Sequence, residues 1–306
     1  MNLFFAESRP YPAGFEDALK KLGHTVYVYK EDTPFSQPEI IDLMIGTRYF
    51  VKFDCTPFTN LRFLQLNSAG YDRVPIERLK AMGVVIANAR GVYGEPIAEW
   101  VVMQWLVAMK LTHAVYQNQL RKEWKYFAAK EARGEEVLIV GTGDIAREIA
   151  KRMRPFNVRI TGVNTDGRKI EGFNTTFAIS ELHNKIGNYD TVILTLPLNE
   201  TTAHLFDAKM IAAMKPGAGI LNIGRGRIVD ENALAEALNK GHLGYSAFDV
   251  FEIEPLPQDS PLWTAKNSIV SPHISYSGQF TKDRLAKLSL RNLEKFVQGK
   301  EVENRV

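Results

Sequence analysis

Three short segments in the C-terminal half of this sequence carry side chains that could move a proton and hold an anion. Arg225 lies in NIGRGR, Glu254 in FEIEP and His273 in SPHIS. A guanidinium can grip a carboxylate with two parallel hydrogen bonds, and Arg225, flanked by two glycines, is a better candidate than Arg227. A carboxylate stabilises a nearby imidazolium, so Glu254 and His273 form a plausible acid–base pair, although such residues are individually more often structural.

A glycine-rich segment, GTGDIA, follows the apolar run EVLIV and precedes a helical pattern. Gly141 would permit a tight turn, Gly143 would let the backbone approach a pyrophosphate, and Ala146 would let helix and strand pack closely. A diphosphate would sit on the helix N-terminus near Asp144 and Ile145. The pattern therefore predicts a dinucleotide site, and the alternative is a tight turn without a ligand.

The segment after the next strand bears on which dinucleotide would bind. NAD sites usually have Asp or Glu there, about 20 residues after the glycines, to bind the ribose hydroxyls. This sequence has the neutral Asn164, and Thr165 and Arg168 could hold a 2′-phosphate, which favours NADP over NAD. Asp166 argues for NAD, and Arg168 could also be a solvated loop residue.

The elements that must position these segments alternate along the whole chain. Short β-branched runs alternate with helical patterns, which predicts parallel sheets in an α/β protein. Strands are expected at 2–6, 25–29, 43–46, 62–66 and 84–87, and in a second series at 136–140, 158–163, 191–196, 219–223, 245–250 and 268–271. Asp207 and Asp230 each fit the N-cap of a helix in the second series.

Two domains are expected from this alternation. Gly94-Glu95-Pro96 opens a long helical pattern and marks the first boundary. The last helical pattern, 281–298, could pack back onto the first domain and make that domain discontinuous. We therefore predict a domain of 1–93 with 276–306 and a second domain of 94–275.

Composition narrows the possible partners. The 306 residues carry a formal net charge of +3, and the densest basic run, 121–130, is interpreted as a solvated helix, so no nucleic acid is expected. Cys55 is the only cysteine, which suits a reducing cytoplasm. No apolar run reaches about 18 residues, so no membrane span is expected.

Taken together, the motifs resemble those of D-2-hydroxyacid dehydrogenases in the formate/glycerate dehydrogenase superfamily. The resemblance covers nearly the whole chain. It rests on SAGYD at 68–72, GTGDIA, the Leu196-Pro197 strand end, NIGRGRIVD, FDVFEIEPLP and SPHIS, in the family's order and spacing. It implies two Rossmann-like parallel-sheet domains, with the cofactor domain inserted in a flavodoxin-like substrate domain.

The resemblance also implies a role for each residue. Arg225 would bind the substrate carboxylate and polarise the carbonyl. His273 would be the general acid for reduction of a 2-keto acid, and Glu254 would hydrogen-bond it. The substrate would also meet Ala69, Gly70 and Tyr71. Cofactor contacts would come from Gly141, Gly143, Asp144, Ile145, Asn164, Thr165, Arg168, Leu196, Pro197, Thr202, Ile223, Gly224, Asp249, His273 and Ser275, with Asp249 at the nicotinamide carboxamide. No metal is expected.

Alternatives remain open at this stage. Glyoxylate, hydroxypyruvate, pyruvate and branched 2-keto acids all fit as substrates, whereas formate is disfavoured because it needs no proton relay. A dinucleotide-sensing scaffold, like the corepressors of the same superfamily, is a second hypothesis. A methyltransferase is a third, but it leaves the Arg, Glu and His motifs unexplained. A homodimer is expected from Trp100, Trp105, Tyr116, Trp124 and Tyr126, unless these aromatics pack internally.

Overall fold

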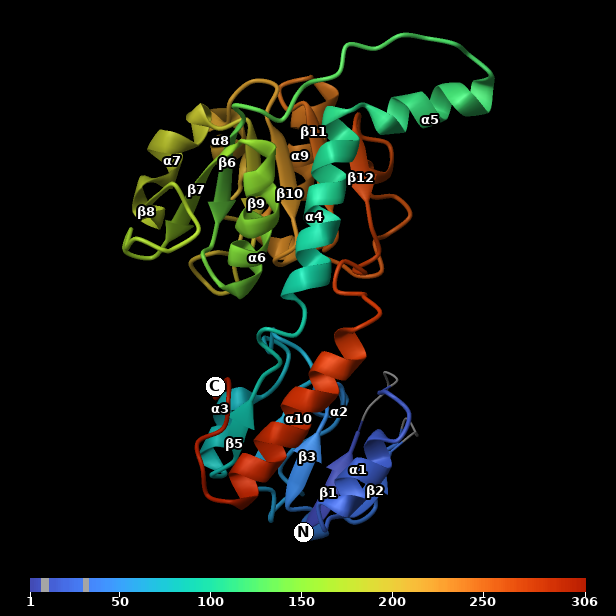
Figure 1. Ribbon diagram of the computed structural model, residues 1–306, viewed down its shortest axis with the longest axis vertical. Coiled ribbons are helices and arrows are strands. Elements are labelled where there is room, and N and C mark those ends of the chain that lie inside the picture. Colours follow the sequence, from blue (N-terminus) through green and yellow to red (C-terminus); the bar gives the residue numbers. More distant parts are fainter. Residues whose placement is uncertain (7–10, 30–32) are drawn as a thin grey trace. The chain divides into compact units, whose positions relative to one another are not determined.

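The computed structural model describes residues 1–6, 11–29 and 33–306. These residues form two compact units, one made of Met1–Tyr93 with Gly278–Val306 and the other of Gly94–Ser277. Each unit is built on a parallel β-sheet (Figure 1). The two sheets confirm the predicted α/β class with two Rossmann-like domains. The chain returns to the first unit at Gly278 rather than at the expected residue 276.

The first unit holds a five-stranded sheet with the flavodoxin-like order β2–β1–β3–β4–β5. The strands are β1 (Asn2–Phe5), β2 (Thr25–Val28), β3 (Leu43–Ile45), β4 (Phe63–Gln65) and β5 (Val85–Ala87). Its helices are α1 (Phe15–Lys21), α2 (Tyr49–Lys52), α3 (Ile76–Ala81) and the C-terminal α10 (Thr281–Val297).

Both faces of this first sheet are covered, which explains why its strands are continuously apolar. Phe4 and Met44 belong to the core on one face, and Leu3 and Leu43 to the core on the other. Leu293 of α10 is fully buried in the second of these cores. The C-terminal helix therefore completes the first unit.

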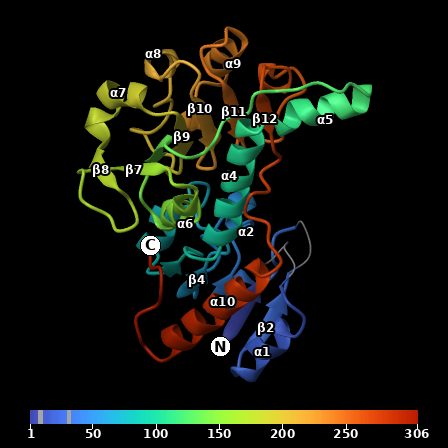
Figure 2. The same cartoon turned by 45° about the horizontal axis from the view of Figure 1, so that its top comes forward.

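The second unit holds a seven-stranded parallel sheet in the order β12–β11–β10–β9–β6–β7–β8 (Figure 2). Its strands are β6 (Glu136–Val140), β7 (Arg159–Asn164), β8 (Thr175–Ala178), β9 (Thr191–Leu194), β10 (Gly219–Asn222), β11 (Tyr245–Phe248) and β12 (Ser268–Val270). Val140 of β6 pairs with Val163 on one side and with Leu194 on the other. The strand order reverses between β6 and β9, and ligands of such sheets bind at this switch point.

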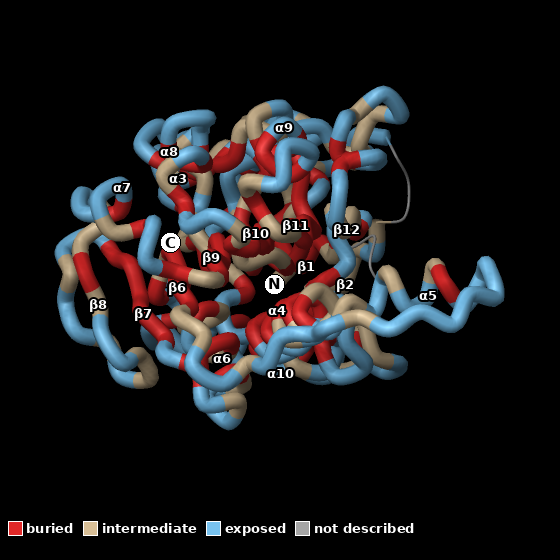
Figure 3. Tube along the Cα trace, turned by 90° about the horizontal axis from the view of Figure 1, so that it is seen from above, coloured by how far each residue is buried: buried red, intermediate tan, exposed pale blue. Residues whose placement is uncertain are grey.

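Helices cover both faces of the second sheet. Figure 3 shows α4 (Gly94–Met109) and α6 (Asp144–Met153) on one side of the buried strands, and α8 (Ala208–Ala213) and α9 (Glu231–Asn239) on the other. The short α7 (Leu182–Lys185) adds Leu182 to the core under α8 and α9. The Asp207 side chain accepts a hydrogen bond from Met210 N, and Asp230 accepts from the N–H groups of Asn232 and Ala233. Both expected N-caps are confirmed.

The helix α5 (Thr112–Arg121) and the segment that follows it extend away from the body of the second unit, and most of their residues are exposed. We expected a solvated helix over 121–130, and this was wrong: the helix ends because Lys122 takes a left-handed φ of 57°, and the chain then runs on without helix. We refer to residues 112–131 as the arm. No helix of the described residues is long and apolar enough to cross a membrane.

Candidate active site

Six strands of the second sheet end at the segments that the sequence singled out. Because all of these strands are parallel, their carboxyl ends lie along one edge of the sheet. The segments begin at Gly141 after β6, Asn164 at the end of β7, Thr195 after β9, Ile223 after β10, Asp249 after β11 and Ser271 after β12. The edge therefore gathers the glycine loop and the Arg225, Glu254 and His273 segments.

The glycine loop has the geometry that a diphosphate needs. Gly141 has a φ of +104°, and a Cβ there would overlap Oγ1 of Thr195. Nothing lies within 4 Å of the position that a Cβ would take on Gly143, so this side of the loop is open. No side chain caps the N-terminus of α6, and the first N–H groups of a helix lack intrahelical acceptors. The loop and helix end thus fit a bound diphosphate.

The turn after β7 is shaped by Asn164. Its Oδ1 accepts a hydrogen bond from Gly167 N at 2.7 Å, and its Nδ2 donates to Arg168 O at 2.8 Å. The exposed Arg168 side chain lies 2.8 Å from the Asp166 carboxylate. The backbone N–H of Arg168, and then its guanidinium, lower the pKa of Asp166. Asn164 therefore supports the turn, while Thr165 and Arg168 are on its exposed side.

The segments after β9 and β10 touch closely. Thr202 is buried and donates from Oγ1 to Pro197 O at 2.7 Å, which holds the 197–202 loop. A Cβ on Gly224 would come within 2.7 Å of Leu196 O, so only glycine fits this approach. Ile223, next in the chain, is buried.

The Arg225 segment is held from both sides. The buried Asn222 accepts from Gly224 N and donates to Arg225 O, both at 3.0 Å. The half-buried Arg225 side chain donates from Nη1 to Gly224 O at 2.8 Å. A Cβ on Gly226 would overlap the backbone of residues 251 and 252, so this segment packs directly on the one that carries Glu254.

Glu254 and His273, which the sequence predicts to be an acid–base pair, are in contact. Nδ1 of His273 lies 2.9 Å from Oε2 of Glu254, and Oε1 of Glu254 accepts from Phe251 N at 3.1 Å. A carboxylate at Nδ1 favours the ring form with a proton on that nitrogen, which leaves Nε2 to exchange a proton with a ligand. The pair can therefore serve as a proton donor and acceptor.

Asp249 has partners that the sequence did not predict. The carboxylate is fully buried and accepts from Ser271 Oγ at 2.7 Å, Ile274 N at 2.9 Å and Ser275 N at 2.9 Å. Both of its oxygens thus bind the segment that carries His273. An Asp at a strand end gives no sequence signal for such a role.

Ala69, Gly70 and Tyr71 lie in the first unit, after β4. Ser68 Oγ donates to Gly70 O at 2.7 Å, and Asn88 Nδ2 donates to Ala69 O at 3.0 Å. Tyr71 is 39% exposed. Sequence reasoning had not assigned the supporting role of Asn88, because an asparagine between a strand and a helix has no distinguishing pattern. These three residues belong to the first unit.

An open glycine loop at a helix N-terminus, at the switch point of a parallel sheet, is the arrangement of a dinucleotide-binding protein, and the Glu254–His273 pair at the same edge has the geometry to exchange a proton. Comparison with known proteins specifies the family. Residues 102–275 match the family model described as D-isomer specific 2-hydroxyacid dehydrogenase, NAD binding domain.

Relatives and solved structures agree with this match. An uncharacterised protein of Corynebacterium melassecola is 32% identical over 81% of this chain and 82% of its own length. Glyoxylate/hydroxypyruvate reductase B of Yersinia pestis is 30% identical over 92% of this chain and 90% of its own. A D-isomer specific 2-hydroxyacid dehydrogenase family protein of Aeromonas salmonicida is 29% identical with a TM-score of 0.85, covering 100% of this chain and 98% of that one.

The chain therefore belongs to the D-isomer specific 2-hydroxyacid dehydrogenase family. It is an oxidoreductase that uses NAD(P) and acts on the CH–OH group of 2-hydroxy acids. The family resemblance and the reaction class drawn from the sequence are confirmed.

Proposed function

We propose that this enzyme reduces a small 2-keto acid, such as glyoxylate, hydroxypyruvate or pyruvate, to the D-2-hydroxy acid. The observation that carries this proposal is the 2.9 Å contact between His273 Nδ1 and Glu254 Oε2, since the segment of Glu254 also packs against the Arg225 segment at the same sheet edge. The similarity to the Yersinia pestis glyoxylate/hydroxypyruvate reductase supports the choice of small substrates.

Each member of this trio has a separate task. Arg225 binds the substrate carboxylate and faces the carbonyl oxygen, where negative charge develops. His273 gives a proton from Nε2 to that oxygen, and takes it back in the reverse reaction. Glu254 holds the ring by Nδ1 and stabilises its protonated form. When bound, the reduced nicotinamide supplies the hydride that adds to C2.

The two units divide the binding. We assign substrate binding to the unit of residues 1–93 and 276–306, through Ala69, Gly70 and Tyr71, and dinucleotide binding to residues 94–275. The support is the location of the glycine loop in the second unit and of the SAGYD segment in the first. Asp249 and Ser275 stay assigned to the nicotinamide end, near His273.

NADP is the preferred cofactor in this proposal. Asn164 places no carboxylate against a 2′-phosphate, and its side chain is engaged within the turn. Arg168 is exposed beside it and is steadied by Asp166 at 2.8 Å. A guanidinium in this position can donate hydrogen bonds to a phosphate.

We also propose a homodimer formed through the second unit. Trp100 and Trp105 are buried within this unit, so part of the predicted aromatic surface packs internally. The arm, in contrast, exposes Tyr116 by 55%, Trp124 by 105% and Tyr126 by 92%. Exposed aromatics in one segment usually mark an interface.

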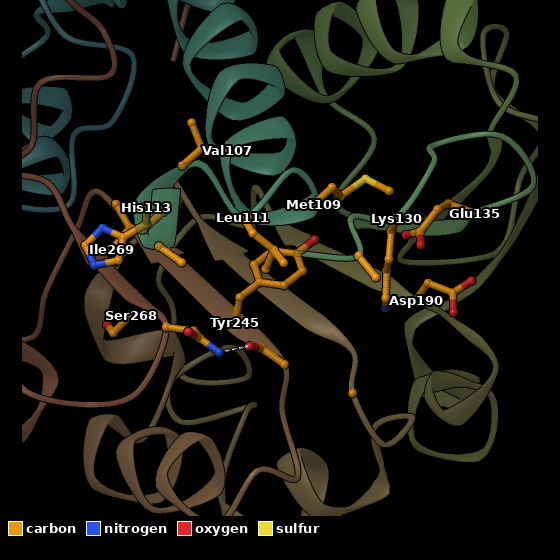
Figure 4. A pocket seen from close by; sticks show the side chains of 16 residues that line it. Val107, Met109, Leu111, His113, Lys130, Glu135, Asp190, Tyr245, Ser268 and Ile269 are labelled. Atoms are coloured by element: carbon orange, nitrogen blue, oxygen red, sulfur yellow. Dashed lines mark hydrogen bonds between the residues drawn. The ribbon is translucent and has the colours of Figure 1, made fainter. Parts of the chain in front are cut away.

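A pocket beside the arm suggests where a second copy would bind. It has a volume of about 190 Å³ and lies at the amino ends of β6, β9, β11 and β12, away from the catalytic segments. Its walls are largely apolar, with Met109, Leu111 and Ile269 around Tyr245, and charged residues gather at one end (Figure 4). Aromatic side chains from the arm of a second copy would suit such walls. A cytoplasmic location is proposed as well, because Cys55 is buried and free.

The proposed chemistry is tested with glyoxylate, hydroxypyruvate, pyruvate and a branched 2-keto acid, each with NADH and NADPH. His273→Ala should lower kcat by about 10²–10⁴-fold, because it removes the proton donor. Arg225→Ala should raise the KM for the keto acid and lower kcat, since losing a charged anchor that is enclosed with the substrate costs about 2–5 kcal/mol. Arg227→Ala is the matched control, because Arg227 is exposed. No turnover with any 2-keto acid, or equal losses in both arginine variants, contradicts the proposal.

The cofactor preference is tested by Arg168→Ala. Removing a charge-assisted contact worth about 1.5–3 kcal/mol should raise the KM for NADPH by about ten- to a hundred-fold. The KM for NADH serves as the internal control and should change little. A wild-type enzyme with higher kcat/KM for NADH would show that this turn does not select NADPH.

The homodimer is tested by light scattering at micromolar concentration. The wild type should have twice the chain mass of 34.5 kDa. Trp124→Ser with Tyr126→Ser should shift the mass toward the monomer, because both side chains would lose an apolar partner surface. Val297→Ser, at a residue that is 50% exposed in the first unit, should leave the mass unchanged. A monomeric wild type rules the dimer out.

A further inference from the structure

The segment that carries His273 has a backbone conformation that needs support. His273 has a φ of +53°, in the left-handed region that only about a few per cent of non-glycine residues adopt, Asn, Asp and His more often than the others. Its N–H donates to Ser271 O at 3.0 Å, which tightens the turn but does not attach it to the sheet. Such conformations persist where the surroundings impose them, and they concentrate at functional sites.

The support comes from the neighbouring strand. Oδ1 of Asp249 accepts from Ser271 Oγ at 2.7 Å and from Ile274 N at 2.9 Å, and Oδ2 accepts from Ser275 N at 2.9 Å. The three donors stand on both sides of His273 in the chain. One carboxylate therefore fixes both ends of the turn that has His273 at its middle.

Water is kept away from the carboxylate and from two of its three donors, whereas Ile274 is 50% exposed. Asp249 is 0% exposed, Ser271 6% and Ser275 5%. Backbone hydrogen bonds also continue past the strand ends on both sides of β11, because Asp249 N donates to Asn222 O of β10 and Ser271 N, after β12, donates to Phe248 O of β11. Charge-assisted hydrogen bonds in a dry site are strong, so the turn is attached firmly to β11.

Glu254 follows β11 on the same stretch of chain as Asp249. The 2.9 Å contact between His273 and Glu254 thus joins two segments whose relative position depends on the bonds of Asp249. If the 271–275 turn moves against β11, the ring moves away from its carboxylate. The position of the proton-carrying nitrogen is then lost as well.

We propose that Ser271 is a positioning residue for proton transfer: its hydroxyl directs the Asp249 carboxylate, and together they preset the conformation of His273. Of the three donors to Asp249 that the described residues provide, Ser271 alone uses a side chain, so it is the member that a substitution can remove. This inference rests on the proposed role of His273 as proton donor. It differs from a role of Asp249 at the nicotinamide, which would act on cofactor binding.

The test compares Ser271→Ala with Ser271→Thr, which keeps the hydroxyl. In Ser271→Ala, kcat for keto-acid reduction should fall by about ten- to a hundred-fold, the effect of losing a buried hydrogen bond to a charged group. The dissociation constant of NADPH, measured by fluorescence titration, should change by less than about two-fold. Ser271→Thr should restore most of kcat.

Ser246→Ala is the matched control. Ser246 is a fully buried serine on β11, and its hydroxyl donates to Ser268 Oγ on β12 at 3.2 Å. This bond joins the same two strands as the Ser271–Asp249 bond, but it lies outside the 271–275 turn. It should leave kcat unchanged. If Ser271→Ala does not fold, Ser271→Cys replaces it, because a thiol has nearly the same shape but is a weak donor, and kcat should again fall.

Three results overturn the inference: a kcat of Ser271→Ala close to that of the wild type, an equal loss in Ser246→Ala, or a loss that appears in NADPH affinity and not in kcat. Failure of the proposed function is distinguishable from these. If His273→Ala keeps its turnover, the catalytic assignment is wrong. If His273→Ala is inactive while Ser271→Ala is normal, only the role of Ser271 is wrong.

Discussion

Parallel pairing in the seven-stranded sheet is the constraint on which the catalytic arrangement depends. Because every strand from β6 to β12 runs in the same direction, each connection that leaves a carboxyl end emerges on the same edge. Residues as far apart in sequence as Gly141 and His273 are brought to that edge without any direct attraction between them. The chemistry is thus positioned by backbone hydrogen bonds and by the buried, β-branched strands that form them.

Close approach of the backbone then brings the loop segments into contact, which the sheet alone does not do. The strands set the segments side by side, but the segments touch only where glycine removes the Cβ. Gly224 lies on Leu196, and Gly226 lies on the backbone beside Glu254. A larger side chain at either position would separate the loops, and Arg225 would move away from Glu254 and His273. The glycines of NIGRGR are therefore part of the catalytic geometry.

Much of this arrangement could be predicted from the sequence, for physical reasons that also mark the limit. Strands such as β9 and β10 are continuous apolar runs, because both faces of the sheet are covered, and their ends locate Leu196 and Arg225. The strand β8 was missed, since its TTFA run is short and only partly buried. The exposed arm after Lys122 was taken for helix, because charge pattern alone does not reveal a residue with positive φ.

Roles inside the site were harder to predict than its location. The sequence indicated Asn164 at the ribose and Asp249 at the nicotinamide, but it did not indicate that the Asn164 amide closes a turn or that the Asp249 oxygens hold the 271–275 turn. A short polar side chain at a strand end can bind a ligand or the next loop, and its residue type is the same in both cases. Only contacts across the sheet distinguish them, and those contacts depend on neighbours that are distant in sequence.

Carboxylates at the two edges of this sheet are stabilised by different kinds of donor. At the carboxyl edge, the buried Asp249 carboxylate accepts hydrogen bonds from a hydroxyl and two backbone N–H groups. At the amino edge, burial and the nearby Asp190 raise the pKa of Glu135, whereas Asp190 keeps a lowered pKa despite burial because Lys215 lies 2.5 Å away. Neutral donors with fixed backbone positions add rigidity, and a flexible lysine adds charge. The carboxyl edge, where His273 lies, uses neutral donors, and the amino edge, beside the arm, uses the ammonium group of a lysine.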